Sequence, residues 1–265
     1  MRYSSKLSFT VLAAFILSGC HARSPAAPAH NSYSTNFPLT ENPISEGGKW
    51  VNGGTTGLDW TNIRTTANVE AYGTNSGTNP GYDDSTAVLQ NIGFTWGPNQ
   101  ISTGTVYLNG NSNVQDPEVE LRLNVTIAAH SITGYMCNFS AKNDGTQYFG
   151  FGRWNGAYGD FTGLLPGGGT ITPSPILHNG DVVSCMRIGN TISAYINGTL
   201  ICGNLSAGGT GCAQVTDSTY LGGSPGISTN IDGNGGTGGG INGTFGFSSF
   251  SASDHAGGIV PASTE

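Results

Sequence analysis

Residues 179–201, NGDVVSCMRIGNTISAYINGTLI, decide the fold of this chain. They contain two runs, 182–188 and 191–196, separated by Gly189-Asn190 and followed by Asn197-Gly198. Glycine and asparagine adopt positive φ at little cost, as tight hairpin turns require. In the second run apolar and polar residues alternate with a period of two, which is typical of a half-buried strand. The stretch therefore predicts an antiparallel β-hairpin.

From residue 44 onward, short apolar runs alternate with turn signals in the same way. In 117–127 every second residue is apolar, which predicts a long strand with one apolar face. No stretch has helical periodicity with caps. The pattern predicts an all-β, two-sheet antiparallel sandwich over 44–252 and a tail at 253–265. Asn-Gly pairs, which favour hairpin turns, begin at residues 52, 109, 155, 179, 197, 234 and 242.

Composition narrows the class of protein. The 265-residue chain has 43 glycines, 9% charged residues and a formal net charge of −7. An ordinary soluble domain has about 25% charged residues, so the low fraction here favours an exported β protein. Outside the N-terminus, lysine and arginine form no cluster that would follow a phosphate backbone. We therefore expect no nucleic-acid partner.

The N-terminus has the pattern of a targeting segment. Arg2 and Lys6 precede an apolar run that is too short for a stable transmembrane helix. The run ends in Leu17-Ser18-Gly19-Cys20, which resembles the lipobox of bacterial lipoproteins. This resemblance implies that residues 1–19 are removed as a signal peptide and that Cys20 carries the lipid, palmitate included. The alternative is an ordinary signal peptide followed by an unrelated cysteine.

The lipobox resemblance also implies a location. The residue after the cysteine is His21 rather than Asp, which by the family's rule permits sorting to the outer membrane of a diderm bacterium. Prolines and small polar residues at 20–43 indicate a flexible tether between membrane and domain. We expect a membrane-anchored protein of the bacterial cell envelope, at the outer membrane or the cell surface.

Four further cysteines predict disulfides, because they form an even number in an exported chain. Three pairings are open. Cys202 and Cys212 flank a glycine-rich loop and suit a short local bridge, whereas Cys137 and Cys185 lie in expected strands and suit a bridge across a sheet. A zinc site is disfavoured, because C-x₂-C spacing and a nearby histidine pair are both missing.

The opening hairpin resembles a pattern of concanavalin A-like lectin/glucanase domains of the laminin-G type. The resemblance covers roughly 44–252, and it implies a jelly roll of two large antiparallel sheets. Its motifs in the hairpin are Gly180-Asp181, Gly189-Asn190-Thr191-Ile192, Tyr195, Asn197-Gly198 and Leu200-Ile201. Further segments in the family's order are Trp60-Thr61-Asn62, Asp116-Pro117-Glu118-Val119, Gly134-Tyr135-Met136, 223–227 and 245–250.

The family includes lectins, carbohydrate-binding modules and glycoside hydrolases, so individual residues must decide the function. Asp116, Glu118 and Glu120 alternate along one expected strand and share a face. Laminarinase-type hydrolases of this fold carry catalytic carboxylates in the order Glu, Asp, Glu, whereas the order here is Asp, Glu, Glu. Arg122 follows on the same face and would lower the pKa of a carboxylate. We favour a solvated strand face and keep catalysis by the three residues as the alternative.

The aromatic segment at 148–161, YFGFGRWNGAYGDF, is the candidate for glycan binding. Tyr148 and Trp154 share a strand face with two glycines, which would leave their rings open for stacking on a sugar. The alternative is that these rings pack in the core. The expected binding residues are Tyr148, Arg153, Trp154, Asn155, Tyr158 and Asp160.

These observations predict a lipid-anchored protein whose non-catalytic jelly roll binds a glycan or polysaccharide. The alternatives are a laminarinase-type glycoside hydrolase and a purely structural or protein-binding module. We assign no cofactor and no metal ligands, and the resemblance leaves a structural calcium open. Asp232-Gly233-Asn234 has calcium-loop composition, but 247–250 lacks the Asp that some relatives have there.

Overall fold

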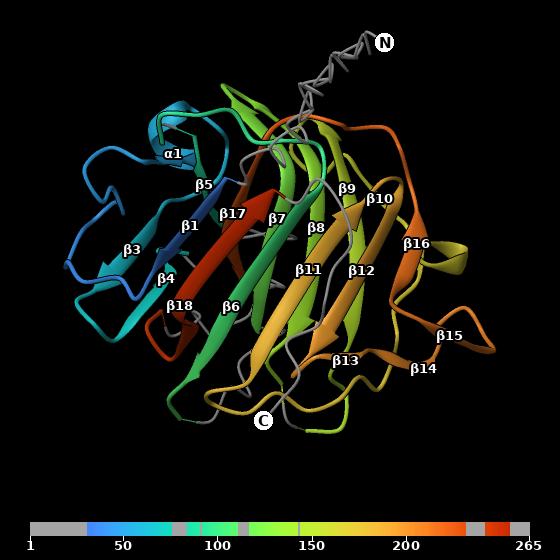
Figure 1. The fold of residues 1–265 in the computed structure, drawn as a ribbon. Helices are drawn as coiled ribbons and strands as arrows, with labels where there is room; N and C mark the ends of the chain where they lie inside the picture. The colour runs from blue at the N-terminus through green and yellow to red at the C-terminus, as the bar shows by residue number, and fades with distance from the viewer. Residues whose placement is uncertain are drawn as a thin grey trace, which may run out of the picture.

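The computed structural model describes residues 31–75, 84–90, 92–110, 117–142, 144–231 and 242–254. In this part of the chain, two antiparallel sheets lie one in front of the other (Figure 1). Sheet A follows the order β13-β12-β11-β6-β18-β4-β3, with β1 beside β18 and β16 beside β12. Sheet B follows the order β10-β9-β8-β7-β17-β5-β2. The predicted two-sheet antiparallel jelly-roll sandwich is confirmed.

Sheet A consists of β1 (Ser32–Thr35), β3 (Ile63–Thr66), β4 (Glu70–Gly73), β6 (Gln100–Leu108), β11 (Val182–Ile188), β12 (Thr191–Ile196), β13 (Thr199–Leu200), β16 (Gln214–Thr216) and β18 (Phe245–Asp254). Sheet B consists of β2 (Trp50–Asn52), β5 (Asp84–Leu89), β7 (Pro117–Ala128), β8 (Ser131–Ser140), β9 (Phe149–Gly156), β10 (Phe161–Gly163) and β17 (Ser224–Ile231). The other elements are the hairpin β14 (Cys202–Asn204) and β15 (Thr210–Cys212), the one-turn helix α1 (Gly53–Thr56) and a 3₁₀ turn at Pro166–Gly168.

The hairpin predicted from residues 179–201 is β11 and β12. Both strands have the predicted bounds, and their register pairs Cys185 with Ala194. Gly189 in the connecting turn has φ 59°, and Asn197 and Gly198 in the next turn have φ 50° and 75°. Gly189, Asn197 and Gly198 therefore adopt the left-handed conformation that glycine and asparagine tolerate, whereas Asn190 does not.

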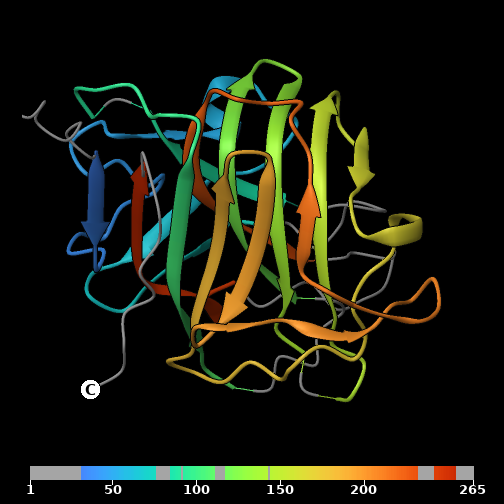
Figure 2. The same cartoon turned by 45° about the vertical axis from the view of Figure 1, so that its right-hand side comes forward.

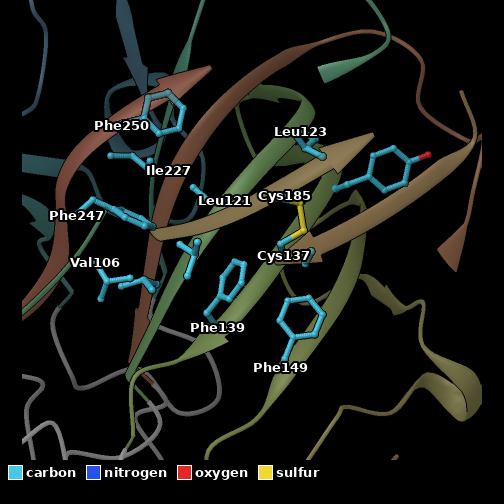
Figure 3. Packing of buried hydrophobic residues seen from close by; sticks show 14 of the residues in the cluster. Val106, Leu121, Leu123, Cys137, Phe139, Phe149, Cys185, Ile227, Phe247 and Phe250 are labelled. Carbon is cyan, nitrogen blue, oxygen red and sulfur yellow. A yellow bond between two sulfur atoms is a disulfide. The ribbon is translucent and has the colours of Figure 1, made fainter. Parts of the chain in front are cut away.

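The hydrophobic core lies between the two sheets, and a disulfide within the core joins one sheet to the other. Cys137 of β8 in sheet B is bonded to Cys185 of β11 in sheet A. Figure 3 shows this bond among large apolar side chains, including Leu121 and Phe139. The second bridge joins Cys202 to Cys212, which pair in the β14–β15 hairpin. Both predicted pairings are confirmed, although the first joins the two sheets rather than two strands of one sheet.

A bulge in β7 turns its apolar side chains from one face of sheet B to the other. The register with β8 shifts between Leu123 and Thr126, and Asn124 at the shift has φ 53°. Apolar residues up to Leu123 pack between the sheets, whereas Val125 and Ile127 join a second cluster outside them. The expectation of one apolar face along this strand is therefore wrong, because the bulge resets the alternation.

The sandwich begins earlier in the chain than the expected boundary at residue 44. Strand β1 pairs with β18 at one side of sheet A, and the side chain of Phe37 is buried in the core. The hydroxyl groups of Tyr33 and Thr35 both donate hydrogen bonds to the buried carboxylate of Glu46. Residues 31–43 are therefore part of the folded domain, and the expected tether can extend only over the residues before them.

Several expectations fall on residues outside the described ranges. These are the signal peptide, the lipidation site at Cys20, the residues at 20–30, the C-terminal residues after Asp254 and the Asp232-Gly233-Asn234 loop. Among the described residues, no helix has the length and apolar character needed to cross a membrane.

Candidate functional site

A cavity of about 250 Å³ lies on the face of sheet B that points away from sheet A. We call it the outer-face cavity. Five neighbouring strands supply its floor, and β10 with the turn that follows it supplies one wall. Figure 2 brings the right-hand edge of Figure 1 forward and shows β10 beside β9. The lining residues are Asp84, Glu118, Glu120, Met136, Asn138, Tyr148, Gly150, Phe151, Trp154, Phe161, Gly163, Gly168, Gly169, Thr170 and Asn230.

Glu118 lies on the floor of the cavity at the start of β7. Its carboxyl accepts a hydrogen bond from the hydroxyl of Tyr148. The amide Nδ2 of Asn230, on neighbouring β17, donates to Glu118 Oε2 at 2.9 Å. Glu118 and Glu120 are 3% and 1% exposed, so the favoured interpretation of a solvated strand face is wrong. The walls of the cavity cover these carboxyls, and alternation within β7 alone cannot reveal that.

Glu120 is paired with a buried arginine on the same strand. Arg122 Nη2 lies 2.6 Å from Glu120 Oε2 and 3.8 Å from Asp84 Oδ1. The same nitrogen donates to Ser228 Oγ at 2.8 Å. The ring of Trp60 covers the guanidinium at 5.2 Å from its centroid. Arg122 is therefore held inside the protein by two acidic residues and an aromatic ring, and it does not line the cavity.

Burial sets the charge state of the two glutamates. Burial, with the charge of Glu120 beside it, raises the pKa of Glu118 to about 8. Burial also raises the pKa of Glu120 to about 7, although the Arg122 charge opposes this shift. Near neutral pH the pair therefore retains a proton, and the cavity offers both a hydrogen-bond donor and acceptors.

The aromatic candidates have different positions relative to the cavity. Tyr148 lines it and is partly exposed. Trp154 lines it but is only 2% exposed, because Trp60 and Phe161 contact its ring at centroid distances of 4.6 and 5.4 Å. Phe161 is 36% exposed at the rim. The most accessible aromatic surface of the cavity is therefore Phe161 rather than the expected Trp154.

The remaining described candidates do not line the cavity. Arg153 Nη1 contacts Asp217 Oδ2 at 2.5 Å. Asn155 Nδ2 donates to Asp160 Oδ1 at 3.1 Å, which holds the turn between β9 and β10. Tyr158 is 37% exposed within this turn. These residues order the hairpin that carries Phe161, and Asp116 lies outside the described residues.

Sequence reasoning missed five residues that shape the site. Asp84 on β5 and Asn230 on β17 are distant from β7 in the chain, so no local signal connects them to Glu118, whereas Asn138 lies on β8, the hairpin partner of β7. Phe161 is the last residue of the aromatic segment 148–161 and the first residue of β10, so its place in that segment was a usable signal. Thr170 follows the 3₁₀ turn and lines the wall. No cluster of three or more His, Cys, Asp or Glu among the described residues could hold a metal ion.

No protein-family model and no curated protein sequence matches this chain. Several solved structures are similar to it. The carbohydrate-binding module CBM66 from Bacillus subtilis is 14% identical with a TM-score of 0.45, over 71% of this chain and 94% of that one. The β-porphyranase BpGH16B from Bacteroides plebeius is 9% identical with a TM-score of 0.41, over 90% and 96%. Lectin I-B4 from Griffonia simplicifolia is 9% identical with a TM-score of 0.39, over 85% and 100%.

At these identities and scores the similarities carry no argument about a ligand. The fold class rests on the strand order of the two sheets, which is the architecture that the resemblance to concanavalin A-like domains implied. Fold and site together define an all-β jelly-roll sandwich whose outer-face cavity has both acidic and aromatic lining residues.

Proposed function

We propose that this protein binds a carbohydrate in the outer-face cavity. The observation that carries the proposal is the combination of hydrogen-bonding carboxyl and amide groups on the floor with an exposed aromatic ring at the rim. A sugar presents hydroxyl groups around its ring and C–H groups on its faces. Ligand pockets with a few placed polar groups among apolar walls suit such a molecule. Asn138 and Asn230 supply both donors and acceptors for hydroxyl groups.

The charge of the cavity favours a neutral glycan. Its lining contains three acidic residues, Asp84, Glu118 and Glu120, and no Lys, Arg or His. A uronic acid or sulfated sugar would meet carboxyls without a cation to pair with, since Arg122 is engaged behind the floor. The expected ligand is therefore an uncharged sugar.

The test compares two aromatic residues of equal exposure on a glycan array. The full chain is screened, and Phe161→Ala is compared with Tyr158→Ala as the matched control, because only Phe161 lines the cavity. We expect affinity for the best neutral glycan to fall on the order of tenfold in Phe161→Ala and to be unchanged in Tyr158→Ala. Absence of binding to every neutral glycan would contradict the proposal and favour a structural or protein-binding module.

A blocking variant provides a second readout. A Cβ on Gly150 would lie 3.6 Å from Thr170 and 3.9 Å from Asn138, which is ordinary contact. Gly150 is a strand residue that lines the cavity, so Gly150→Val is compatible with β9 and fills the space. We expect this variant to keep its thermal stability and lose glycan binding. Retained affinity would place the sugar elsewhere.

Glycoside hydrolysis is the second candidate. It is favoured by Glu118 and Glu120, two neighbouring carboxyls that face the cavity with raised pKa values, as acid catalysis requires. The pairing of Glu120 with Arg122 speaks against a free nucleophile. Release of reducing ends from a panel of β-glucans by the wild type, and not by Glu118→Gln or Glu120→Gln, would establish hydrolysis. No release from any of them would reject it.

Lipid anchoring through Cys20 and a place in the bacterial cell envelope belong to the same proposal. The lipobox resemblance supports both. Metabolic labelling with an alkynyl palmitate analogue should mark the wild type and not Cys20→Ser, and only the wild type should fractionate with membranes. A structural calcium at Asp232-Gly233-Asn234 stays a prediction, which a calcium-dependent melting temperature would support.

A further inference from the structure

The outer-face cavity is closed at one end by an apolar cluster on the same sheet face. Trp154 and Met136 line the cavity and also belong to this cluster. Leu58 and Trp60, from the segment after α1, pack over it. The cluster exists because the bulge at Asn124 turns the apolar side chains of β7 outward. Beyond Trp154, the sheet face is therefore filled by protein side chains and leaves no path for a ligand.

A second side is closed by backbone. A Cβ on Gly163 of β10 would lie 2.4 Å from the carbonyl oxygen of Gly168, so β10 and the 3₁₀ turn contact each other without a gap. Gly168, Gly169 and Thr170 then line the cavity next to β10. A chain cannot cross the cavity in this direction either.

The volume is small. At about 250 Å³, the cavity is below the range of about 300–1,000 Å³ that is typical of pockets for drug-sized ligands. This volume fits a ligand with one sugar ring rather than several. A small cavity that is closed at one end and along one side accommodates the terminal residue of a glycan. An internal residue is bonded to the glycan chain on both sides, so one of its two neighbouring sugars would have to occupy the space of Trp154 or of the β10 wall.

We propose that the outer-face cavity receives the terminal residue of a neutral glycan and not an internal segment, an inference that rests on the proposed carbohydrate binding. Phe161 at the rim then contacts either the terminal ring or the residue next to it. Glu118, Asn138 and Asn230 hydrogen bond to the hydroxyl groups of the terminal residue. The affinity therefore depends on which sugar is at the end of the glycan and not on the length of the glycan.

The first experiment measures length dependence. The full chain is titrated with neutral glucan, mannan, galactan and fructan oligosaccharides of one to six residues, together with the polysaccharide of each series. We expect one series to bind with an affinity that changes less than about threefold beyond two residues. An affinity that rises more than tenfold between two and six residues would indicate a multi-residue groove and overturn the proposal.

The second experiment counts chain ends. The polysaccharide that binds is cut by an endo-acting hydrolase, and the number of protein-binding sites per gram is measured before and after. Terminal recognition predicts that sites per gram rise in proportion to the new ends, whereas internal recognition predicts no rise. For an α-1,4-linked glucan ligand, maltohexaose should bind and α-cyclodextrin, which has the same linkage and no end, should not. If no glycan binds at all, the proposed carbohydrate binding is wrong. That outcome differs from binding to internal residues, which would contradict only the proposal of terminal recognition.

Discussion

At the scale of single residues, the carboxyls of β7 show how burial changes the chemistry of a strand face. Glu118 and Glu120 alternate with core residues as surface residues do, yet both are almost fully covered. Their raised pKa values follow from this burial, to which the charge of Glu120 adds for Glu118 and the charge of Asp84 adds for Glu120. The folded protein therefore holds a proton near neutral pH that the unfolded chain releases.

This difference predicts a pH dependence of stability. The pKa of Glu118 is about 8 in the folded protein and about 4.3 in an unfolded chain. Between these values only the unfolded state loses the proton, so the free energy of unfolding falls as pH rises from about 4.5 to about 8. Urea unfolding across this range should show the fall in the wild type and a flatter profile in Glu118→Gln. Identical slopes would show that Glu118 is ionised in the folded protein.

The buried ion pair predicts a second stability effect. Arg122→Met removes the cation beside Glu120 and leaves a buried carboxylate without it, which costs on the order of 3–5 kcal/mol. The double variant Glu120→Gln/Arg122→Met removes both charges and should recover part of that loss. Urea unfolding of the wild type, both single variants and the double variant gives the coupling energy. Additive losses would mean that the two side chains do not interact.

At the scale of elements, the bulge in β7 divides the outer face of sheet B into a polar half and an apolar half. Before the bulge, Glu118, Glu120 and Arg122 point outward, and after it Val125 and Ile127 do so. One residue in the left-handed conformation therefore ends the cavity and begins the cluster that closes it. The local geometry of β7 sets the length of the site.

The bulge can be tested at Asn124. Its φ of 53° suits asparagine or glycine, whereas a β-branched side chain there adds strain on the order of 1–2 kcal/mol. Asn124 Nδ2 also donates to the Pro98 carbonyl at 3.1 Å. We expect Asn124→Val to lower the urea midpoint more than Asn124→Gly, which loses only the side-chain hydrogen bond. Equal losses would mean that backbone conformation is not the cause.

At the scale of the whole molecule, the two disulfides have different roles. Cys137 and Cys185 join the two sheets within the core and are fully buried, whereas Cys202 and Cys212 lie exposed on a hairpin. Their separations are 48 and 10 residues. Closing these loops contributes about 4 and about 3 kcal/mol in the chain-entropy description. The buried bridge therefore constrains the unfolded chain more, and it is also the less accessible to reductant.

Selective reduction follows from this arrangement. Dithiothreitol under native conditions should expose two thiols, at Cys202 and Cys212, and four only after unfolding. Alkylation followed by mass spectrometry identifies the labelled cysteines. Cys202→Ala/Cys212→Ala serves as the control and should show no native labelling at the remaining pair. Native labelling of Cys137 would mean that the sheets separate readily.

The sequence by itself determined the β-hairpin at 182–196, the two-sheet antiparallel class and the expectation that four cysteines form disulfides, whereas the structure fixed their pairing. These features depend on turn residues, on the alternation of apolar and polar residues and on the positions of the cysteines, all of which can be identified in short stretches of sequence. It also placed Glu118, Glu120 and Tyr148 among the candidates. Only the tertiary structure decided that they meet in one cavity with Asp84 and Asn230. Strands distant in the chain become neighbours in sheet B, and the segment carrying Trp60 folds over its face, so the burial that shifts the pKa values and closes the cavity has no local signal.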